Sequence, residues 1–221
     1  MFTGIIQAIG SVVHSEPRDG DIRLTIDCGD LDISRVAPGD SIAVNGVCLT
    51  AIELHQQNFV ADVSVETMNL TSLGALAAGS PVNLETALTL NTALGGHLVS
   101  GHVDGLGTLL EMHTDARSMR YSFAVAPEIQ HYIAIKGSVT VDGCSLTVNG
   151  INGNRFDVNI VPHTQQKTVF QFYKSGCRVN IEVDIIARYL ERLLQGKADS
   201  DAGKDSQLLE TLIKSGFTSH E

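Results

Sequence analysis

The chain has 221 residues, with 15 Lys and Arg against 25 Asp and Glu, so its formal charge is −10. This acidity argues against a partner that is nucleic acid or an anionic membrane, because clustered Lys and Arg side chains hold both of those surfaces. Hydrophobic residues make up 43% of the chain and charged residues 18%, a composition that supports packed cores and excludes a disordered protein.

Cysteine spacing and the N-terminal residues indicate the compartment. Cys28, Cys48, Cys144 and Cys177 are far apart and form no C-x-x-C pair, so we expect free thiols and no metal site. The first ten residues lack the basic region of a secretion signal, and no apolar run approaches the roughly 18 residues that span a bilayer. The sequence therefore predicts a soluble, cytoplasmic protein that does not bind membranes.

The first part of the chain is predicted to be β-structure. Residues 4–13 are typical of a strand interrupted by a glycine, which could be a bulge. Residues 42–52 place Asn45-Gly46 between short apolar runs, the pattern of a tight hairpin whose turn residues need positive φ. Residues 59–65 predict another strand, and residues 66–76 a helical turn.

The same order of elements follows further along. Residues 101–112 predict a strand broken by glycine, residues 139–149 a hairpin around Asp142-Gly143, and residues 156–162 a strand. Residues 163–173 again suggest a helical turn. Several short strands with a turn signal every ten or so residues favour a small closed barrel.

An internal repeat explains this recurrence. At an offset of 97, residues 1–88 align without gaps on residues 98–185, so that Leu49-Thr50 meets Leu146-Thr147 and Glu85 meets Glu182. We therefore predict an all-β fold of two tandem barrels, with a first domain over 1–97, including its linker, and a second over 98–185.

The chain changes character after Asp184. Apolar side chains recur at helical spacing and predict an amphipathic helix over 186–195, which packs either on its own barrel or in an oligomer contact; they are Ile185, Ile186, Tyr189, Leu190, Leu193 and Leu194. Residues 196–221 form a polar tail, apart from a weak helical pattern over 208–217.

The two copies differ in their reactive side chains. Cys48 stands where the second copy has Ser145, and the second copy holds most of the groups that carry charge or move protons: His102, Lys136, Asp142, His163 and Asp184, against Ile5, Gly39, Asn45, Glu66 and Ala87. Each has a structural alternative. His102 could be a satisfied strand histidine, Cys48 a small buried hydrophobe, Asp142 a turn former and Lys136 a solvated charge.

Several separated motifs resemble the riboflavin synthase family. They are Met1 to Ile6, Gly95 to Gly105, the two hairpins Asn45 to Thr50 and Asp142 to Thr147, and Val179 to Glu182, and the resemblance spans roughly residues 1–194. It implies two six-stranded Greek-key antiparallel barrels, a C-terminal helix that assembles a homotrimer, and no metal or organic cofactor. It also implies that two molecules of 6,7-dimethyl-8-ribityllumazine are converted into riboflavin and 5-amino-6-ribitylamino-uracil by transfer of a four-carbon unit.

The resemblance also implies site residues. The catalytic candidates are His102, Ser145, Cys48, Asp142, Lys136 and Asp184. We expect a first lumazine pocket from Gly4, Ile5, Ile6, Cys48, Leu49, Thr50, Asp62, Val63, Ser64, Val65, Glu66 and Thr67. We expect a second from Gly101, His102, Val103, Ser145, Leu146, Thr147, Asn159, Ile160, Val161, Pro162, His163 and Thr164, with Lys136 reaching a ligand in another chain.

The resemblance places the active site between the first barrel of one subunit and the second barrel of its neighbour. His102, aided by Ser145, is the preferred group for removing a proton from the 7-methyl of one lumazine, and Cys48 could assist at the other ring. The nearest alternative is a non-catalytic lumazine- or flavin-binding protein of the same fold. A flavin reductase, suggested by Arg120-Tyr121-Ser122, is set aside because too few residues follow 185 for a nucleotide-binding domain.

Overall fold

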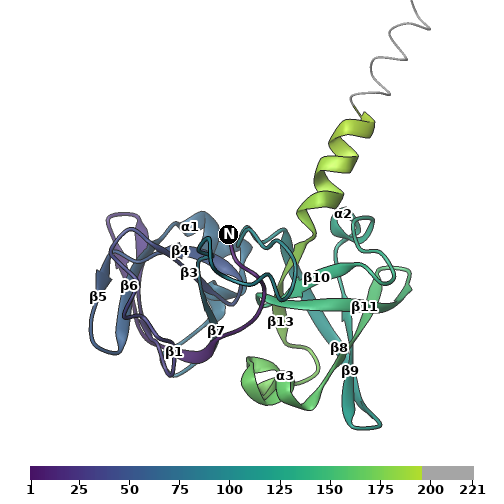
Figure 1. The fold of residues 1–221 in the computed structure, drawn as a ribbon, viewed down its shortest axis with the longest axis horizontal. Coiled ribbons are helices and arrows are strands. Elements are labelled where there is room, and N and C mark those ends of the chain that lie inside the picture. Colours follow the sequence, from purple (N-terminus) through teal and green to yellow (C-terminus); the bar gives the residue numbers. More distant parts are fainter. Residues whose placement is uncertain (196–221) are drawn as a thin grey trace, which may run out of the picture. The chain divides into compact units, whose positions relative to one another are not determined.

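Two similar antiparallel sheets account for most of residues 1–184 in the computed structural model, which describes residues 1–195 (Figure 1). Met1–Asp184 form one unit and the residues from Ile185 onward a second. The tail over 196–221 and its weak helical pattern lie outside the described residues.

The first sheet belongs to the first repeat. Its strands are β1 (Ala8–Arg18), β2 (Asp21–Asp27), β3 (Ser41–Val44), β4 (Val47–Thr50), β5 (Glu53–Leu54), β6 (Asn58–Val63) and β7 (Pro81–Thr86), with helix α1 (Val65–Leu70) and the 3-10 helix η1 (Ser72–Ala75) before β7. The order across the sheet is β4-β3-β7-β1-β2-β6-β5. The two edge strands, β4 and β5, are neighbours in the chain, separated only by Ala51 and Ile52.

The second repeat forms a closed barrel. It contains β8 (Gly105–Asp115), β9 (Ser118–Ala124), α2 (Pro127–Gln130), β10 (Ser138–Val141), β11 (Cys144–Asn152), β12 (Arg155–Ile160), α3 (Pro162–Lys167), η2 (Val169–Phe172) and β13 (Arg178–Val183). The ring runs β10-β11-β12-β9-β8-β13, the same circuit as in the first repeat, except that the continuous β11 replaces β4 and β5. The prediction of two tandem β-barrels is confirmed, with the first one interrupted at Ala51.

Both predicted hairpins form where the dipeptides stand. Asn45 and Gly46 have φ of 45° and 77°, and Asp142 and Gly143 have φ of 44° and 78°, so both turns use the left-handed region that these residues tolerate. The predicted glycine bulges lie elsewhere. The registers of β1 and β8 shift between Val12 and His14 and between Leu109 and Glu111, three residues beyond Gly10 and Gly107.

Each repeat has its own core. Ile26, Ile42, Phe59 and Leu84 are fully buried in the first, whereas the second is richer in rings, because Tyr121, Phe123, Phe156 and Phe170 pack in a chain of aromatic contacts. Residues that are equivalent in the two repeats meet where the cores adjoin. Phe2 pairs with Val99, and the backbones of Gly46 and Gly143 are so close that a Cβ on either glycine would lie within 2.8 Å of the other.

Two asparagines tie the hairpins together crosswise. The Asn83 side chain donates from Nδ2 to the carbonyl oxygen of Asp142 at 2.9 Å, and the Asn180 side chain donates from Nδ2 to the carbonyl oxygen of Asn45 at 2.8 Å. An asparagine on β7 therefore donates a hydrogen bond to the hairpin turn of the second repeat, and one on β13 donates to the turn of the first. These crossed bonds join the two repeats into one unit.

The predicted C-terminal helix is present over residues 185–195, one residue earlier than expected. Among residues 1–195, no helix is both long and apolar enough to cross a membrane.

Candidate functional site

Each repeat has a short segment near its start that passes toward the other barrel. These segments are residues 2–6 in the first repeat and residues 99–103 in the second. The Ser145 amide donates to the carbonyl oxygen of Gly4 at 2.7 Å, and the Cys48 amide donates to the carbonyl oxygen of Gly101 at 2.9 Å. Both glycines have positive φ, and a Cβ on either would lie 2.6 Å from the Cβ of the residue it faces. Glycine is therefore required at both positions for the segment to reach the opposite hairpin.

Two buried carboxylates fix these segments to their own barrels. Glu85 on β7 accepts hydrogen bonds from the Thr3 amide at 2.7 Å and the Gly4 amide at 3.0 Å. Glu182 on β13 accepts equivalent bonds from the Ser100 amide at 2.6 Å and the Gly101 amide at 2.9 Å. Burial raises the pKa of both carboxyls, although the hydrogen bonds oppose that rise. The two carboxylates therefore hold the backbone of residues 2–6 and 99–103 in place, and the side chains at the end of each segment are available to line a site.

The segments exchange partners between the repeats, which corrects the expected grouping of site residues. Ile6 packs against the core of the second repeat, and Val103 packs against the core of the first. Gly4, Ile5 and Ile6 therefore belong with Ser145, whereas Gly101, His102 and Val103 belong with Cys48. Sequence alignment alone could not show this, because equivalent segments cross to opposite barrels.

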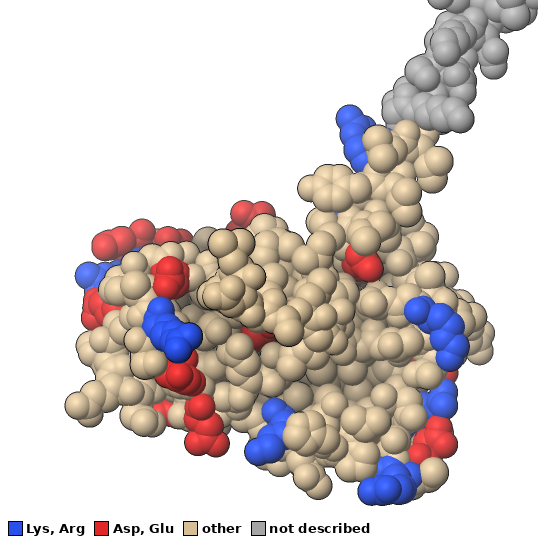
Figure 2. Space-filling view, viewed as in Figure 1, with Lys and Arg blue, Asp and Glu red and all other residues tan. Residues whose placement is uncertain are grey.

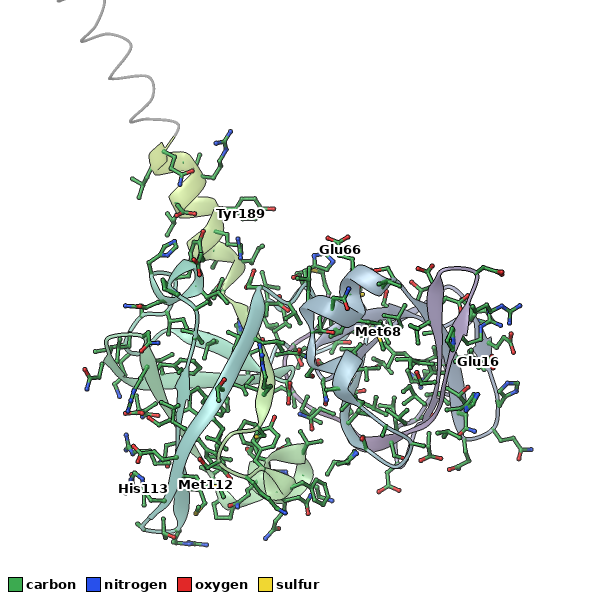
Figure 3. The ribbon with its side chains drawn as sticks, turned by 180° about the vertical axis from the view of Figure 1, so that it is seen from behind. Glu16, Glu66, Met68, Met112, His113 and Tyr189 are labelled. Carbon is green, nitrogen blue, oxygen red and sulfur yellow. The ribbon has the colours of Figure 1, made fainter. Side chains whose placement is uncertain are left out.

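The first cluster surrounds a cavity of about 220 Å³. It is lined by Val47, Cys48, Glu66, Thr67, Leu70, Thr71, Gly101, His102 and Val103. His102 is exposed, Cys48 is half-buried, and Glu66 projects outward from α1 (Figure 3). A histidine, a thiol and a carboxylate thus share one opening, where they can exchange protons with a bound ring and bond to its polar groups.

The second cluster is built around Ser145 and His97. The Ser145 hydroxyl and His97 Nδ1 are 2.7 Å apart, and His97 Nε2 is buried without a hydrogen-bond partner among the described residues. Burial lowers the pKa of His97, partly offset by the negative charge of Asp184, so the ring is neutral at neutral pH and can accept the Ser145 proton. Ser145 was expected to aid His102, but within one chain its hydroxyl bonds to His97 instead.

The equivalent strands β6 and β12 differ in whether an arginine pairs with the residue at one equivalent position, Asp62 or Asn159. Asp62 on β6 receives two hydrogen bonds from the Arg23 guanidinium, the shorter at 2.7 Å, and this contact lowers the pKa of Asp62. In the second repeat Arg120 turns to Asp115 at 2.8 Å. Asn159, the equivalent of Asp62, keeps a buried Oδ1 without a partner in the described part of the chain, which leaves an acceptor available to a ligand.

The remaining expected binding residues frame these clusters. Leu49, Val63 and Ile160 are buried in the barrel cores, and Leu146 packs at the edge of the second core. Ser64 caps α1 by accepting from the Thr67 amide at 3.1 Å, and Pro162 occupies the first turn of α3. Thr50, Val65, Thr147, Val161 and His163 are exposed, and Thr164 is half-buried on α3.

Besides Ser145, three catalytic candidates lie outside the Cys48–His102 cavity. Asp142 is buried at the junction of the repeats, where it accepts hydrogen bonds from the Asn180 amide and the Tyr173 hydroxyl, and burial raises its pKa to about 7. Lys136 is exposed with φ of 67°, before β10. Asp184 is half-buried, and its charge acts on His97.

Sequence reasoning missed His97, Glu85 and Glu182 as site residues. The two glutamates did carry a signal, because the repeat retains the same carboxylate at the same position of both strands. His97 had none, since it lies in the linker and has no counterpart in the first repeat.

Charge is uneven over the molecule. On the face shown in Figure 2, Asp and Glu gather over the first repeat, whereas Lys and Arg are prominent over the second. Residues 1–97 contain 11 Asp and Glu against 3 Lys and Arg, whereas residues 98–185 contain 8 against 7, so the repeat that carries Cys48 is the more acidic one.

A family model, the lumazine binding domain, matches this chain twice, at residues 3–87 and 100–184. A riboflavin synthase from Photobacterium phosphoreum is 44% identical over 98% of this chain and 99% of its own length. A riboflavin synthase from Bacillus subtilis is 38% identical over 98% of this chain and all of its own length.

Solved structures show a similar fold. LumP complexed with riboflavin superposes with a TM-score of 0.76 at 22% identity and covers 83% of this chain and 99% of LumP. LumP complexed with 6,7-dimethyl-8-(1'-D-ribityl) lumazine gives a TM-score of 0.74 at 21% identity, with the same coverage. The duplicated domain and the full-length relatives show that the chain is an enzyme of the riboflavin synthase family.

Proposed function

We propose that the chain converts two molecules of 6,7-dimethyl-8-ribityllumazine into riboflavin and 5-amino-6-ribitylamino-uracil. The observation that carries this proposal is the pair of equivalent clusters with different reacting groups, Cys48 with His102 and Ser145 with His97. A reaction between two copies of one substrate needs two similar sites, and opposite roles for the two copies need different side chains. The two products together contain all the atoms of the two substrates, so the transfer consumes no oxidant or reductant.

In the proposed reaction His102 removes a proton from the 7-methyl of one bound lumazine. The resulting carbanion is delocalised into the ring, and histidine exchanges protons near neutral pH. The exposed position of His102 at the cavity allows the ring to come within reach. Its hydrogen-bonded backbone fixes the approach, because the His102 amide donates to the Ser100 hydroxyl at 3.2 Å and Glu182 holds Ser100.

Ser145 and His97 have a different role in this proposal. A neutral His97 that accepts the Ser145 proton makes the Ser145 oxygen a better nucleophile or hydrogen-bond acceptor toward the second lumazine. Cys48 occupies the equivalent place in the other cluster, where no histidine of the described residues is hydrogen-bonded to its thiol. Holding the two rings face to face then contributes several kcal/mol by orientation.

We also propose that the active unit is a homotrimer. The single-chain Cys48–His102 cavity, at about 220 Å³, is smaller than the roughly 300–1,000 Å³ of complete ligand pockets, so a neighbouring subunit would complete it. Ile186, Tyr189, Leu190, Leu193 and Leu194 of the C-terminal helix are more than half exposed in the single chain, which supports a role in assembly. In this assembly Lys136, also exposed, reaches the ligand of another chain. The four free cysteines support a cytoplasmic setting.

The decisive experiment incubates the purified protein with 6,7-dimethyl-8-ribityllumazine alone and follows absorbance and product composition. Catalysis yields one riboflavin and one 5-amino-6-ribitylamino-uracil for every two lumazines consumed. Stable binding at fixed stoichiometry, without riboflavin, would identify a non-catalytic lumazine-binding protein and refute the proposal.

A further inference from the structure

A cavity of about 820 Å³ lies where the two repeats meet, beside the Cys48–His102 opening, with which it shares Thr71. Its volume falls within the roughly 300–1,000 Å³ typical of small-molecule sites. Residues from both repeats line it, and five pairs are equivalent at the offset of 97: Asn45 and Asp142, Ser72 and Val169, Ala75 and Phe172, Leu76 and Tyr173, and Pro81 and Arg178. The cavity therefore straddles the axis that relates the repeats.

The two walls have diverged in chemistry. Where the first repeat contributes Ala75, Leu76 and Pro81, the second contributes Phe172, Tyr173 and Arg178. The Phe172 ring is 52% exposed, although most aromatic rings of this repeat are buried in its core. If the two repeats were identical, both would contribute the same side chains to a cavity on the axis between them. Because the side chains differ, the cavity favours an asymmetric ligand.

Charge limits what that occupant can be. The two ionised candidates on the lining are Asp142 and Arg178. Asp142 is buried and engaged by Tyr173 and the Asn180 amide, whereas the exposed Arg178 guanidinium forms no ion pair within residues 1–195. Arg178 is therefore the charge available to a ligand, and a guanidinium binds carboxylate, sulfonate or phosphate groups.

A polar group on the opposite wall also lacks a partner. The Ser72 hydroxyl is buried and has no hydrogen-bond partner among the described residues, and Ser72 itself is 8% exposed. A buried hydroxyl without a partner carries an energetic cost that a ligand acceptor would remove. Apolar side chains also contribute to the lining; among them are Ile22, Val65, Met68 and Leu106.

Helix α1 lies between this cavity and the candidate active site, and Thr71, which follows the helix, lines both. Val65, Met68 and Asn69 line the cavity between the repeats, whereas Glu66, Thr67 and Leu70 line the opening that holds His102. Met68 and Glu66 accordingly occupy different sides of α1 in Figure 3.

We propose that the cavity between the repeats is a second ligand site, which binds a planar aromatic anion with its ring against Phe172 and its acidic group at Arg178. The ring gains stacking and apolar burial, and the anion gains a charge-assisted hydrogen bond. The proposal does not depend on the reaction assigned to His102.

The probe is 1-anilinonaphthalene-8-sulfonate, with the uncharged N-phenyl-1-naphthylamine for comparison, titrated against the full-length protein by fluorescence. We expect one sulfonate probe per chain. Arg178→Gln should weaken the sulfonate at least fivefold and leave the uncharged probe unchanged, and Phe172→Ala should weaken both. Arg117→Gln and Met112→Ala are matched controls that should change neither, since Met112 lies on β8 well away from Met68 (Figure 3).

Two further measurements separate the alternatives. The chain contains no Trp, so Phe172→Trp introduces a single reporter at the cavity, and its emission should be quenched by the bound sulfonate probe. Riboflavin formation should be unchanged in Arg178→Gln, which keeps this test distinct from the proposed function. Three outcomes would each overturn the proposal. The variants could all bind the probe with equal affinity, or lumazine could displace the probe while the Trp emission is not quenched. Phe172→Ala could also lose oligomerisation and keep probe binding.

Discussion

Replacing Asp142 by Asn should change how the stability of the protein depends on pH. Asp142 is fully buried, and burial raises its pKa from 3.8 to about 7. The native state therefore binds more protons than the unfolded state between pH 4 and 7, so stability falls as pH rises through this window. A shift of about 3 pH units, at 1.36 kcal/mol per unit, gives about 4 kcal/mol over the whole window and about 3 kcal/mol between pH 5 and 8.

Asparagine is a suitable replacement because Asn45 occupies the equivalent position, where its Oδ1 accepts from the Asn83 amide at 2.7 Å. An Asn at 142 can accept from the Asn180 amide in the same way and cannot ionise. Relative to the parent protein, the variant should gain about 3 kcal/mol between pH 5 and 8.

The assay is urea unfolding at fixed protein concentration, monitored by circular dichroism at several pH values. Asp30→Asn, at an exposed site, makes the same change in net charge and should leave the pH dependence nearly parallel to that of the parent. Tyr173→Phe removes the hydroxyl that lowers the pKa of Asp142, and should extend the fall in stability to higher pH. Parallel curves for Asp142→Asn and the parent would refute the assignment of a buried, titrating carboxyl to this junction.

Four other expectations follow from the clusters and the junction. His102→Gln should lower riboflavin formation at least a hundredfold in a steady-state assay while lumazine binding, measured by fluorescence, is retained; turnover like that of the parent would remove His102 from the reaction. Ser145→Ala should lower turnover and abolish any contribution of His97 to the pH–rate profile, so an unchanged profile would contradict the pairing at 2.7 Å. Gly143→Ala should cost about 2 kcal/mol or more in urea unfolding, because its φ is 78° and a Cβ would lie 2.7 Å from the Gly46 nitrogen; a smaller cost would mean that the two backbones separate easily. Ending the chain after Asp184 should reduce the mass seen by light scattering to that of a monomer and lower turnover, and a trimer of the shortened chain would place assembly elsewhere.

The repeat and its hairpins could be predicted because their causes are local. Asn45-Gly46 and Asp142-Gly143 supply residues that tolerate positive φ, and apolar alternation on either side determines the faces of the strands. The bulges could not be placed, since the register shift three residues beyond Gly10 and Gly107 arises from pairing with β2 and β9 and not from the glycines.

The candidate site was predictable in its residues and not in its grouping. Cys48 and His102 were identified by comparing the two copies, but they line one cavity only because residues 99–103 cross to the first barrel. That crossing is stabilised by Glu182, which accepts hydrogen bonds from the segment, and by the Cys48 amide, which donates one to it. Both residues are distant in sequence from residues 99–103. The pairing of Ser145 with His97 escaped prediction for the same reason, since the two residues are 48 positions apart.

The crosswise asparagines have a consequence for synthesis on the ribosome. Within residues 1–195, the Asn45 carbonyl and the Ser72 amide have the side chain of Asn180 as their hydrogen-bond partner, and Asn180 is synthesised more than a hundred residues after Ser72. While the second repeat is still being made, the first carries open polar groups and an uncovered hairpin. Completion of the first barrel must then wait for nearly the last strand of the second, so the two repeats reach their final form together, late in translation.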